Sequence, residues 1–374
     1  MKRLFGLALA GLLFIGSFSA PAVADNHVIR VLTQNLYLGA DLTPLLLAED
    51  FDELEIAATA VIEQIAANFF PLRAQRLATV VALSQPDVIC LQEVFDFKLN
   101  DLNDGLPFID YLQAIRNALA ARGQYYQVAA TVVNLDLDID LTFDITGEGI
   151  PDSVQVLDRD VILVREGVEN VTATDFTGLC SKSSGEGCNY LNVAQFTSLL
   201  GLITIERGFV GVDVTARGKD YRVVNTHLEQ KELFSGFPAP YQSQQAAELV
   251  TTLAGLSSDN RTLILTGDFN SSPADPTGGS IDPPYEIISN AGFADIWDTN
   301  PLALFDPNGF TCCQDPDLAN RMSHLDERID IIFVFDSSFL PRAFVTSRVP
   351  IFPLWLPPNW ASDHGGVFGK LIFW

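Results

Sequence analysis

The stretch that decides the fold is Thr262-Leu-Ile-Leu-Thr-Gly-Asp-Phe-Asn-Ser-Ser-Pro273. Its apolar run, Leu263 to Leu265, predicts a buried strand. Asp268 and Asn270 follow Gly267, and residues two apart in a strand lie on the same face. A carboxylate and an amide that meet at one point can bind a hard cation or orient a water, although the same pattern also occurs in ordinary turns. The rest of the chain has to decide between these interpretations.

Residues 1–24 have the pattern of a secretory signal peptide. Lys2-Arg3 is a short basic region, residues 4–18 are apolar, and Ala22-Val-Ala24 offers small residues for cleavage. The apolar run is too short for a typical membrane span, and an uncleaved anchor is the alternative. We therefore expect an exported protein, secreted or periplasmic, whose mature chain starts at Asp25.

Residues 25–374 are predicted to form a single domain, because no Pro/Gly/Ser-rich linker, repeat or low-complexity tract divides them. The chain has 47 acidic and 22 basic residues and a formal net charge of −25. Such a surface repels polyanions on average, and no Lys/Arg-rich segment of the kind used to track DNA is present in the sequence. An enzyme of this charge would need metal ions to neutralise a phosphate substrate.

The five cysteines of an exported chain allow at most two disulfides. Cys180 and Cys188 flank a polar loop and are expected to pair. The adjacent Cys312 and Cys313 could form a vicinal bridge or take part in a longer connection. Cys90 lies in an apolar run and is expected to be a buried free thiol. No cysteine spacing suits zinc.

Strands and helices alternate irregularly along the chain. Strands are predicted at 28–35, 87–93, 124–134, 154–164, 209–214, 221–226, 262–265, 328–334 and 366–373, and helices at 51–83 with a break at Pro71, at 108–121 and at 241–256. This order excludes a simple parallel sheet. Two packed mixed sheets with helices outside account best for the apolar content.

One acidic segment alternates strictly, Leu135-Asp-Leu-Asp-Ile-Asp-Leu141. A strand would place its three aspartates on one face. The spacing resembles a calcium loop, but the sixth position is Leu141 rather than glycine and the twelfth is Gly147 rather than glutamate. We predict a solvated acidic hairpin over 135–153, with adventitious calcium binding as the alternative.

Polar residues that can bind a metal or transfer a proton stand at the ends of the apolar strands. They are Asn35, Glu93, His227, Asp268, Asn270, Asp330, Ser362, Asp363 and His364. At a common rim, Glu93 with Asn35 or Asp363 would supply oxygen ligands for Mg²⁺ or Mn²⁺. A histidine paired with an aspartate can take a proton from water. Each residue alone also has an ordinary explanation as a strand end, a turn or a local ion pair, so the prediction depends on their joint occurrence.

Five motifs in order resemble those of the endonuclease/exonuclease/phosphatase superfamily, which includes deoxyribonucleases, abasic-site endonucleases, inositol-polyphosphate phosphatases and bacterial sphingomyelinases. The motifs are Leu91-Gln-Glu93, Thr226-His-Leu228, Gly267-Asp-Phe-Asn270, Arg328-Ile-Asp-Ile-Ile-Phe333 and Ser362-Asp-His364. The resemblance runs from Val28 to the C-terminus. It implies an α+β fold, a four-layer α/β/β/α sandwich of two mixed β-sheets flanked by helices, and metal-dependent phosphoester hydrolysis.

The resemblance also implies roles for the metal side of the site. Asn35, Glu93 and Asp363 are similar to metal-side residues, with Mg²⁺ expected and Mn²⁺ or Ca²⁺ as alternatives. Asp268 and Asn270 are similar to the residues that orient the nucleophile and the phosphate.

The remaining roles concern proton transfer and phosphate binding. His364 resembles the general base and Asp330 its partner. His227 resembles a second histidine that binds phosphate or donates a proton, and Arg207 resembles, weakly, a phosphate-contacting arginine. Asp158-Arg-Asp160 could contribute to the site or form buried ion pairs.

The uncharged segment 349–360 precedes the last motif and contains Trp355 and Trp360. Such residues can insert into a membrane interface or pack against the core, and bacterial sphingomyelinases resemble this chain in carrying an apolar hairpin at this point.

We therefore expect an exported phosphoester hydrolase that slightly favours lipid head-group phosphodiesters, with both tryptophans as substrate or membrane contacts. The alternatives are a secreted nuclease acting on DNA or RNA and, more remotely, a non-catalytic binding protein with this fold. We infer no protein partner.

Overall fold

The structure is a computed structural model that describes residues 27–100, 108–144, 149–199, 201–231, 241–256, 259–279, 281–335, 337–348, 350 and 357–374. The predicted signal peptide and Trp355 lie outside these residues. No helix in the described ranges is long and apolar enough to cross a membrane.

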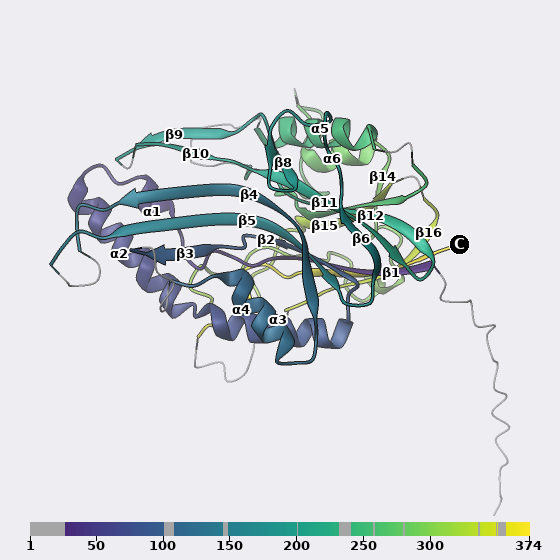
Figure 1. Ribbon diagram of the computed structural model, residues 1–374, viewed down its shortest axis with the longest axis horizontal. Coiled ribbons are helices and arrows are strands. Elements are labelled where there is room, and N and C mark those ends of the chain that lie inside the picture. The colour runs from purple at the N-terminus through teal and green to yellow at the C-terminus, as the bar shows by residue number, and fades with distance from the viewer. Residues whose placement is uncertain are drawn as a thin grey trace, which may run out of the picture.

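Two large sheets make up the centre of the molecule (Figure 1). The first has the order β16 (Phe339–Val345), β17 (Val367–Phe373), β1 (Val28–Asn35), β2 (Val88–Gln92), β5 (Ser153–Arg165) and β3 (Asp96–Leu99), with β4 (Tyr126–Asp140) also paired to β5. The second has the order β14 (Phe293–Asp295), β15 (Asp330–Phe335), β13 (Thr262–Asp268), β12 (Lys219–His227), β11 (Gly208–Ala216), β8 (Gly187–Asn189) and β7 (Ser183–Ser184), with β6 (Glu169–Ala173) on β11. Each sheet contains a parallel pair, β1–β2 and β12–β13, among antiparallel ones, so both are mixed as predicted.

The alternation of side chains along the strands divides the core into layers. In β13, Ile264 packs between the two sheets, whereas its neighbour Leu265 points to the outer face. Helices α5 (Tyr241–Ala254) and α6 (Pro284–Asn290) cover that outer face with Leu249 and Ile288. On the first sheet, α2 (Phe51–Ala67), α3 (Phe70–Ser84) and α4 (Tyr111–Ala120) form the corresponding layer. The predicted four-layer sandwich is confirmed.

Smaller elements complete the chain. They are α1 (Thr43–Leu46), the 3₁₀ turn η2 (Pro301–Leu304) and the separate hairpin of β9 (Ala194–Ser198) and β10 (Gly201–Ile205). Cys180 is bonded to Cys188 and Cys312 to Cys313, and Cys90 is buried and free.

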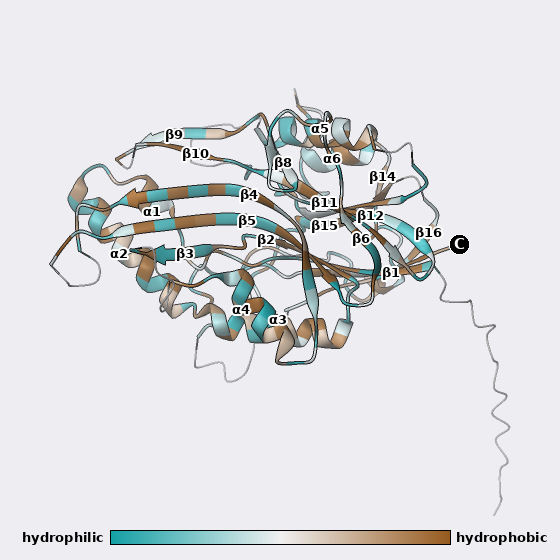
Figure 2. Ribbon diagram, viewed as in Figure 1, coloured by the Kyte–Doolittle hydropathy of each residue, from teal (hydrophilic) through white to brown (hydrophobic). Residues whose placement is uncertain are grey.

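The acidic segment is the outer part of one long strand. The strand predicted at 124–134 continues into the acidic hairpin predicted over 135–153, because β4 runs on to Asp140 and its outer residues pair with the start of β5, from Leu135 with Asp158 to Asp140 with Ser153. Asp136, Asp138 and Asp140 are exposed on one face, as predicted, and the apolar residues between them face the other way. Figure 2 shows this alternation along β4 and β5.

Candidate active site

Three neighbouring strands of the second sheet carry His227, Asp268 and Asp330 at one level. His227 pairs in register with Asp268, and Asp268 with Asp330. Gly267 permits the close approach of β13 to β12, because a Cβ atom at this position would lie 2.0 Å from the carbonyl oxygen of Thr226. The Gly-Asp-x-Asn motif therefore sets the spacing of the strands as well as supplying the site residues.

The first sheet supplies Asn35 at the end of β1 and Glu93 just after β2. The Asn35 amide nitrogen donates to Glu93 Oε1 at 3.1 Å and to Asp268 Oδ2 at 3.0 Å. The backbone nitrogen of Leu38 donates to Glu93 Oε2 at 2.8 Å. Asn35 thus joins the two sheets at the rim where the predicted residues gather.

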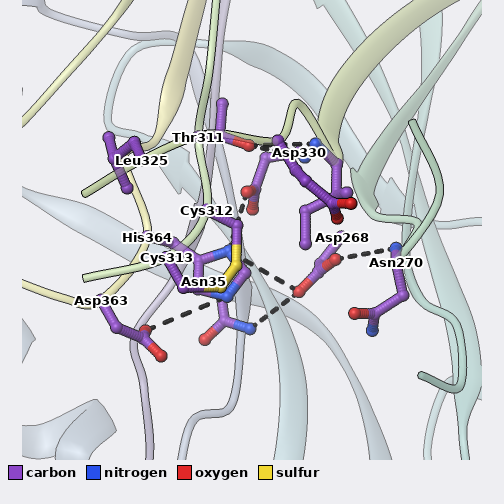
Figure 3. Close-up of a disulfide and its surroundings, with 12 residues drawn as sticks. Asn35, Asp268, Asn270, Thr311, Cys312, Cys313, Leu325, Asp330, Asp363 and His364 are labelled. Atoms are coloured by element: carbon purple, nitrogen blue, oxygen red, sulfur yellow. Dashed lines mark hydrogen bonds and ion pairs between the residues drawn. A yellow bond between two sulfur atoms is a disulfide. The ribbon is translucent and has the colours of Figure 1, made fainter. Parts of the chain in front are cut away.

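His364 lies against a group of carboxylates (Figure 3). Its Nδ1 is 2.8 Å from Oδ2 of the fully buried Asp330 and 3.8 Å from Asp268 Oδ2, and its Nε2 is 3.9 Å from Asp363 Oδ1. Burial lowers the pKa of His364, but the carboxylates of Asp330, Asp363 and Asp268 outweigh it and raise the pKa well above the usual value. The contact with Asp330 leaves Nε2 as the nitrogen that can exchange a proton with a ligand.

His227 has the opposite environment. Nη1 of Arg207 lies 3.0 Å from His227 Nδ1, and because a guanidinium can only donate, Nδ1 accepts and the ring proton resides on Nε2. Burial and then the charge of Arg207 lower the pKa of His227 well below its usual value, so the ring is neutral. Nη2 of Arg207 lies 3.4 Å from Glu229 Oε1. Arg207 was predicted to contact phosphate; it lines the cavity, but its guanidinium is engaged behind His227.

Asp268 lies between the two histidines, and Asn270 lies beside it next to His227. Asp268 Oδ1 accepts from the backbone nitrogen of Asn270 at 2.9 Å. Burial and the neighbouring charge of Asp330 raise the pKa of Asp268 to about 6. The Asn270 amide nitrogen donates to the carbonyl oxygen of Leu228 at 2.9 Å and lies 3.3 Å from His227 Nε2. Both residues line the cavity, where they can orient a water or a phosphoryl oxygen.

The metal-side residues form an oxygen donor set. Glu93 and Asp363 line the cavity, and Asn35 lies just behind Glu93. Burial raises the pKa of Asp363 to about 7, with Glu93 adding to the effect of burial and His364 opposing it. The Asn35 amide oxygen instead accepts from the backbone nitrogen of Tyr37 at 2.8 Å, so Asn35 positions Glu93 through its amide nitrogen rather than facing the cavity. Carboxylate oxygens suit a hard divalent cation, and added positive charge would stabilise the ionised carboxylates. The residues therefore fit the expected metal.

Two buried aspartates adjoin this set. Asp158 lines the cavity, and burial raises its pKa to about 7. Burial and the charge of Asp158 raise the pKa of Asp160 well above its usual range. Sequence analysis left the role of these residues open, and the structure places Asp158 within the site.

Trp360 was predicted to contact substrate or membrane, and the structure shows that this is wrong. Its side chain is 1 % exposed and packs with Tyr37 and Leu318. The indole nitrogen donates to the carbonyl oxygen of Asn320 at 2.8 Å, so both the apolar and the polar part of the ring are satisfied within the fold. The role of Trp355 stays a prediction.

Sequence analysis did not predict the cysteine pair as part of the site. Cys312 and Cys313 line the cavity beside His364 (Figure 3). The backbone nitrogen of the next residue, Gln314, donates to the carbonyl oxygen of Asp363. Their adjacency was the available signal, but it does not indicate a position near the active site.

The site thus combines a histidine–aspartate pair, a second neutral histidine, an acid and an amide between them, and an oxygen donor set for a divalent cation. This combination defines a metal-dependent phosphoester hydrolase. The chain belongs to the Endonuclease/Exonuclease/phosphatase family, whose sequence profile matches residues 33–364. The enzymes of this family are divalent-metal-dependent phosphoesterases, nucleases and phosphatases among them.

Solved structures show the same fold at low sequence identity. The chain is similar to an endonuclease/exonuclease/phosphatase from Beutenbergia cavernae, with 19 % identity, TM-score 0.51, and coverage of 93 % of this chain and 72 % of that one. It is also similar to the mannosyl-6-phosphatase Bt3783 of Bacteroides thetaiotaomicron, with 17 % identity, TM-score 0.51, and coverage of 92 % and 100 %. A comparison with curated protein sequences finds no significant match.

Proposed function

We propose that the protein is an exported Mg²⁺-dependent hydrolase of phosphodiesters, with lipid head-group phosphodiesters slightly favoured. The observation that carries the proposal is the placement of two histidines with opposite partners, Asp330 and Arg207, on either side of Asp268. Mn²⁺ or Ca²⁺ are alternatives to Mg²⁺ for the same oxygen donors.

The side chains divide the reaction between them. Asp268 and Asn270 hold the attacking water in line with the phosphorus. His364, oriented by Asp330, accepts the proton of that water at Nε2. His227 donates a hydrogen bond from Nε2 to a phosphoryl oxygen, because Arg207 holds the proton on that nitrogen. A divalent cation held by Glu93 and Asp363 would offset the negative charge of the phosphate, with Asn35 orienting Glu93 through its amide nitrogen.

Charge supports the preference for a lipid head group over a polynucleotide. The chain carries a formal net charge of −25, which opposes binding of a polyanion. A head group presents a single phosphodiester and avoids most of this repulsion. A secreted nuclease is the second candidate, and membership of a family that includes nucleases supports it.

A matrix of metals and substrates tests the proposal. The substrates are sphingomyelin, phosphatidylcholine, plasmid DNA, single-stranded DNA, RNA and sugar phosphates, each with Mg²⁺, Mn²⁺ or Ca²⁺, and Asp268→Asn serves as the blank. We expect choline phosphate to be released from the lipids. Cleavage of nucleic acids alone would favour the nuclease, and release of inorganic phosphate from sugar phosphates alone would exclude a diesterase. Detection of the chain in the culture medium or periplasm, starting at Asp25, tests export.

A further inference from the structure

A cavity of about 520 Å³ extends from the catalytic residues along the β4–β5 hairpin; we call it the hairpin cavity. At one end it is lined by polar residues, among them His227, Asp268 and His364. Apart from Asp41 and Thr43, the rest of its wall is apolar and comes from α1, α2, β3, β4, β5 and β10 and the segments next to them. The catalytic site and the apolar space are therefore one continuous cavity.

The pairing of β4 with β5 makes one wall of the hairpin cavity a graded surface. Leu135 pairs with Asp158 beside the catalytic residues, and the next pairs on the same face are Leu137 with Val156 and Ile139 with Val154. All of these residues line the cavity. From Leu135 to Leu141 this face is about 20 Å long at the usual rise of a strand. The polar residue among these pairs, Asp158, thus lies at the catalytic end, and the two pairs beyond it are apolar.

Helix α2 supplies another part of the wall. Leu54, Ala58, Val61, Ile62 and Ile65 line the cavity and follow the spacing of a single helical stripe. On the β4–β5 hairpin, Leu137 and Ile139 are only partly buried, which leaves apolar surface available to a ligand. Filling this space with hydrocarbon would remove the apolar surface of the hairpin from water, whereas most of the α2 stripe is already buried and would contribute contacts.

We infer that the hairpin cavity binds the hydrocarbon chain of an amphiphilic phosphodiester whose phosphate lies between His227 and His364. This inference rests on the proposed function, and it adds a binding site for the part of the substrate that does not react. The apolar wall is continuous with the catalytic end of the cavity. The cavity is therefore suited to a molecule that has one charged end and one apolar end.

The charges around the cavity argue against a polynucleotide as the occupant. Arg207 is the one lysine or arginine among the described residues that line it. Asp136, Asp138 and Asp140 are exposed along the outer face of the same hairpin and would repel a chain of phosphates. A hydrocarbon chain carries no charge, so it does not need lysine or arginine residues in the cavity and is not repelled by these aspartates.

A chain-length series with monomeric substrates tests the inference through turnover. Alkyl p-nitrophenyl phosphates from methyl to octyl release the same chromophore from the same phosphodiester. We expect kcat/KM to rise about two- to fourfold with each added methylene until the cavity is filled. In Leu137→Lys, the ratio of kcat/KM for the octyl ester to kcat/KM for the methyl ester should fall towards one. Thr142→Lys is the matched control, since it adds the same charge at an exposed position of the same segment outside the cavity and should keep the wild-type ratio.

Binding provides a second measurement that does not depend on turnover. Calorimetric titration with alkylphosphocholines from hexyl to dodecyl, below their critical micelle concentrations, should show affinity that increases with chain length in wild type and not in Leu137→Lys. If the methyl ester is hydrolysed while kcat/KM and affinity are independent of chain length, the inference is wrong and the proposed function stands. Chain-length-dependent binding without any hydrolysis would support the cavity and contradict the proposed function. A dimer in solution that dissociates in Leu137→Lys, without chain-length dependence, would assign the cavity to a second copy.

Discussion

At the scale of single residues, the neighbours of the two histidines account for their different roles. His364 has Asp330 at 2.8 Å, and His227 has Arg207 at 3.0 Å. The carboxylates raise the pKa of His364, whereas burial and the guanidinium lower the pKa of His227. Ionisable groups whose pKa values are moved in opposite directions in one site are suited to be an acid–base pair with separate tasks.

The substitution Asp330→Asn should lower kcat about 100-fold or more, because His364 loses the carboxylate that orients it. As a general base His364 must be neutral, and Asp330 helps to raise its pKa. Loss of that charge should therefore move the acidic limb of the kcat/KM profile to lower pH. The measurement is a pH–rate profile of both proteins, with the exposed Asp138→Asn as a control; an unshifted limb would argue against this pairing.

For Arg207→Gln we expect a higher pKa of His227, because a positive charge 3.0 Å from Nδ1 is removed. The tautomer held by Arg207 should be lost, and kcat should fall about 10- to 100-fold. Nitrogen chemical shifts of the imidazole report tautomer and protonation directly. A His227 ring that keeps its proton on Nε2 and its low pKa in the variant would show that Arg207 does not position it.

Asp158 makes the stability of the metal-free protein depend on pH. Burial raises its pKa to about 7 from 3.8, so between these values the folded state holds a proton that the unfolded state releases. Stability should fall as pH rises through this range. Asp158→Asn removes the cost of ionising this carboxyl. The free energy of unfolding of the variant, relative to that of wild type, should therefore increase from pH 5 to pH 8 by up to about 3 kcal/mol, and its melting temperature should rise accordingly. Thermal unfolding in EDTA measures this, and a pH-independent difference would contradict it.

At the scale of elements, the sequence was most informative where apolar strands end in polar residues. The strands β1, β2, β12, β13 and β15 were predicted from alternating or continuous apolar residues, and their ends carry the site. The edge strand β16 was not predicted, because it contains Pro341 and alternates weakly. The contact of Arg207 with His227 depends on the pairing of Gly208 with His227 across β11 and β12, which local patterns do not contain.

The dependence on tertiary structure also explains why the burial of Trp360 and the hairpin cavity were not predicted from the sequence. An uncharged run such as 349–360 does not indicate which of its residues turn inward, and Trp360 proved to be buried. The hairpin cavity requires the register of β4 and β5 together with the position of α2, which are properties of the tertiary structure.

The substitution Gly267→Ala tests the importance of the approach of β13 to β12. Its Cβ would meet the carbonyl oxygen of Thr226 at 2.0 Å, so the strands must separate or the pairing of His227 with Asp268 must shift. We expect a loss of several kcal/mol in stability and of most activity. Gly278→Ala is the control, since nothing lies within 4 Å of a Cβ there although its φ is also positive. Wild-type stability and turnover in Gly267→Ala would contradict the argument.

At the scale of the whole molecule, an acidic protein places a cluster of buried and partly buried carboxylates at the rim shared by its two sheets. Glu93 and Asp363 line the cavity there together with Asp158 and Asp268, and Arg207 is the one lysine or arginine among the described lining residues. Such a cluster is stable and useful when a divalent cation offsets its charge. We therefore propose that the molecule hydrolyses phosphodiesters with a divalent metal and with His364 as the base.

The most direct measurement is the rate of hydrolysis of bis-p-nitrophenyl phosphate by wild type and His364→Ala, each with Mg²⁺, Mn²⁺, Ca²⁺ or EDTA. His324→Ala is the matched control, because His324 is exposed, pairs with Asp315 and lies outside the cavity. We predict turnover that requires a divalent metal, is retained in His324→Ala and falls at least about 100-fold in His364→Ala. Turnover that persists in EDTA, or that survives in His364→Ala, would contradict the account.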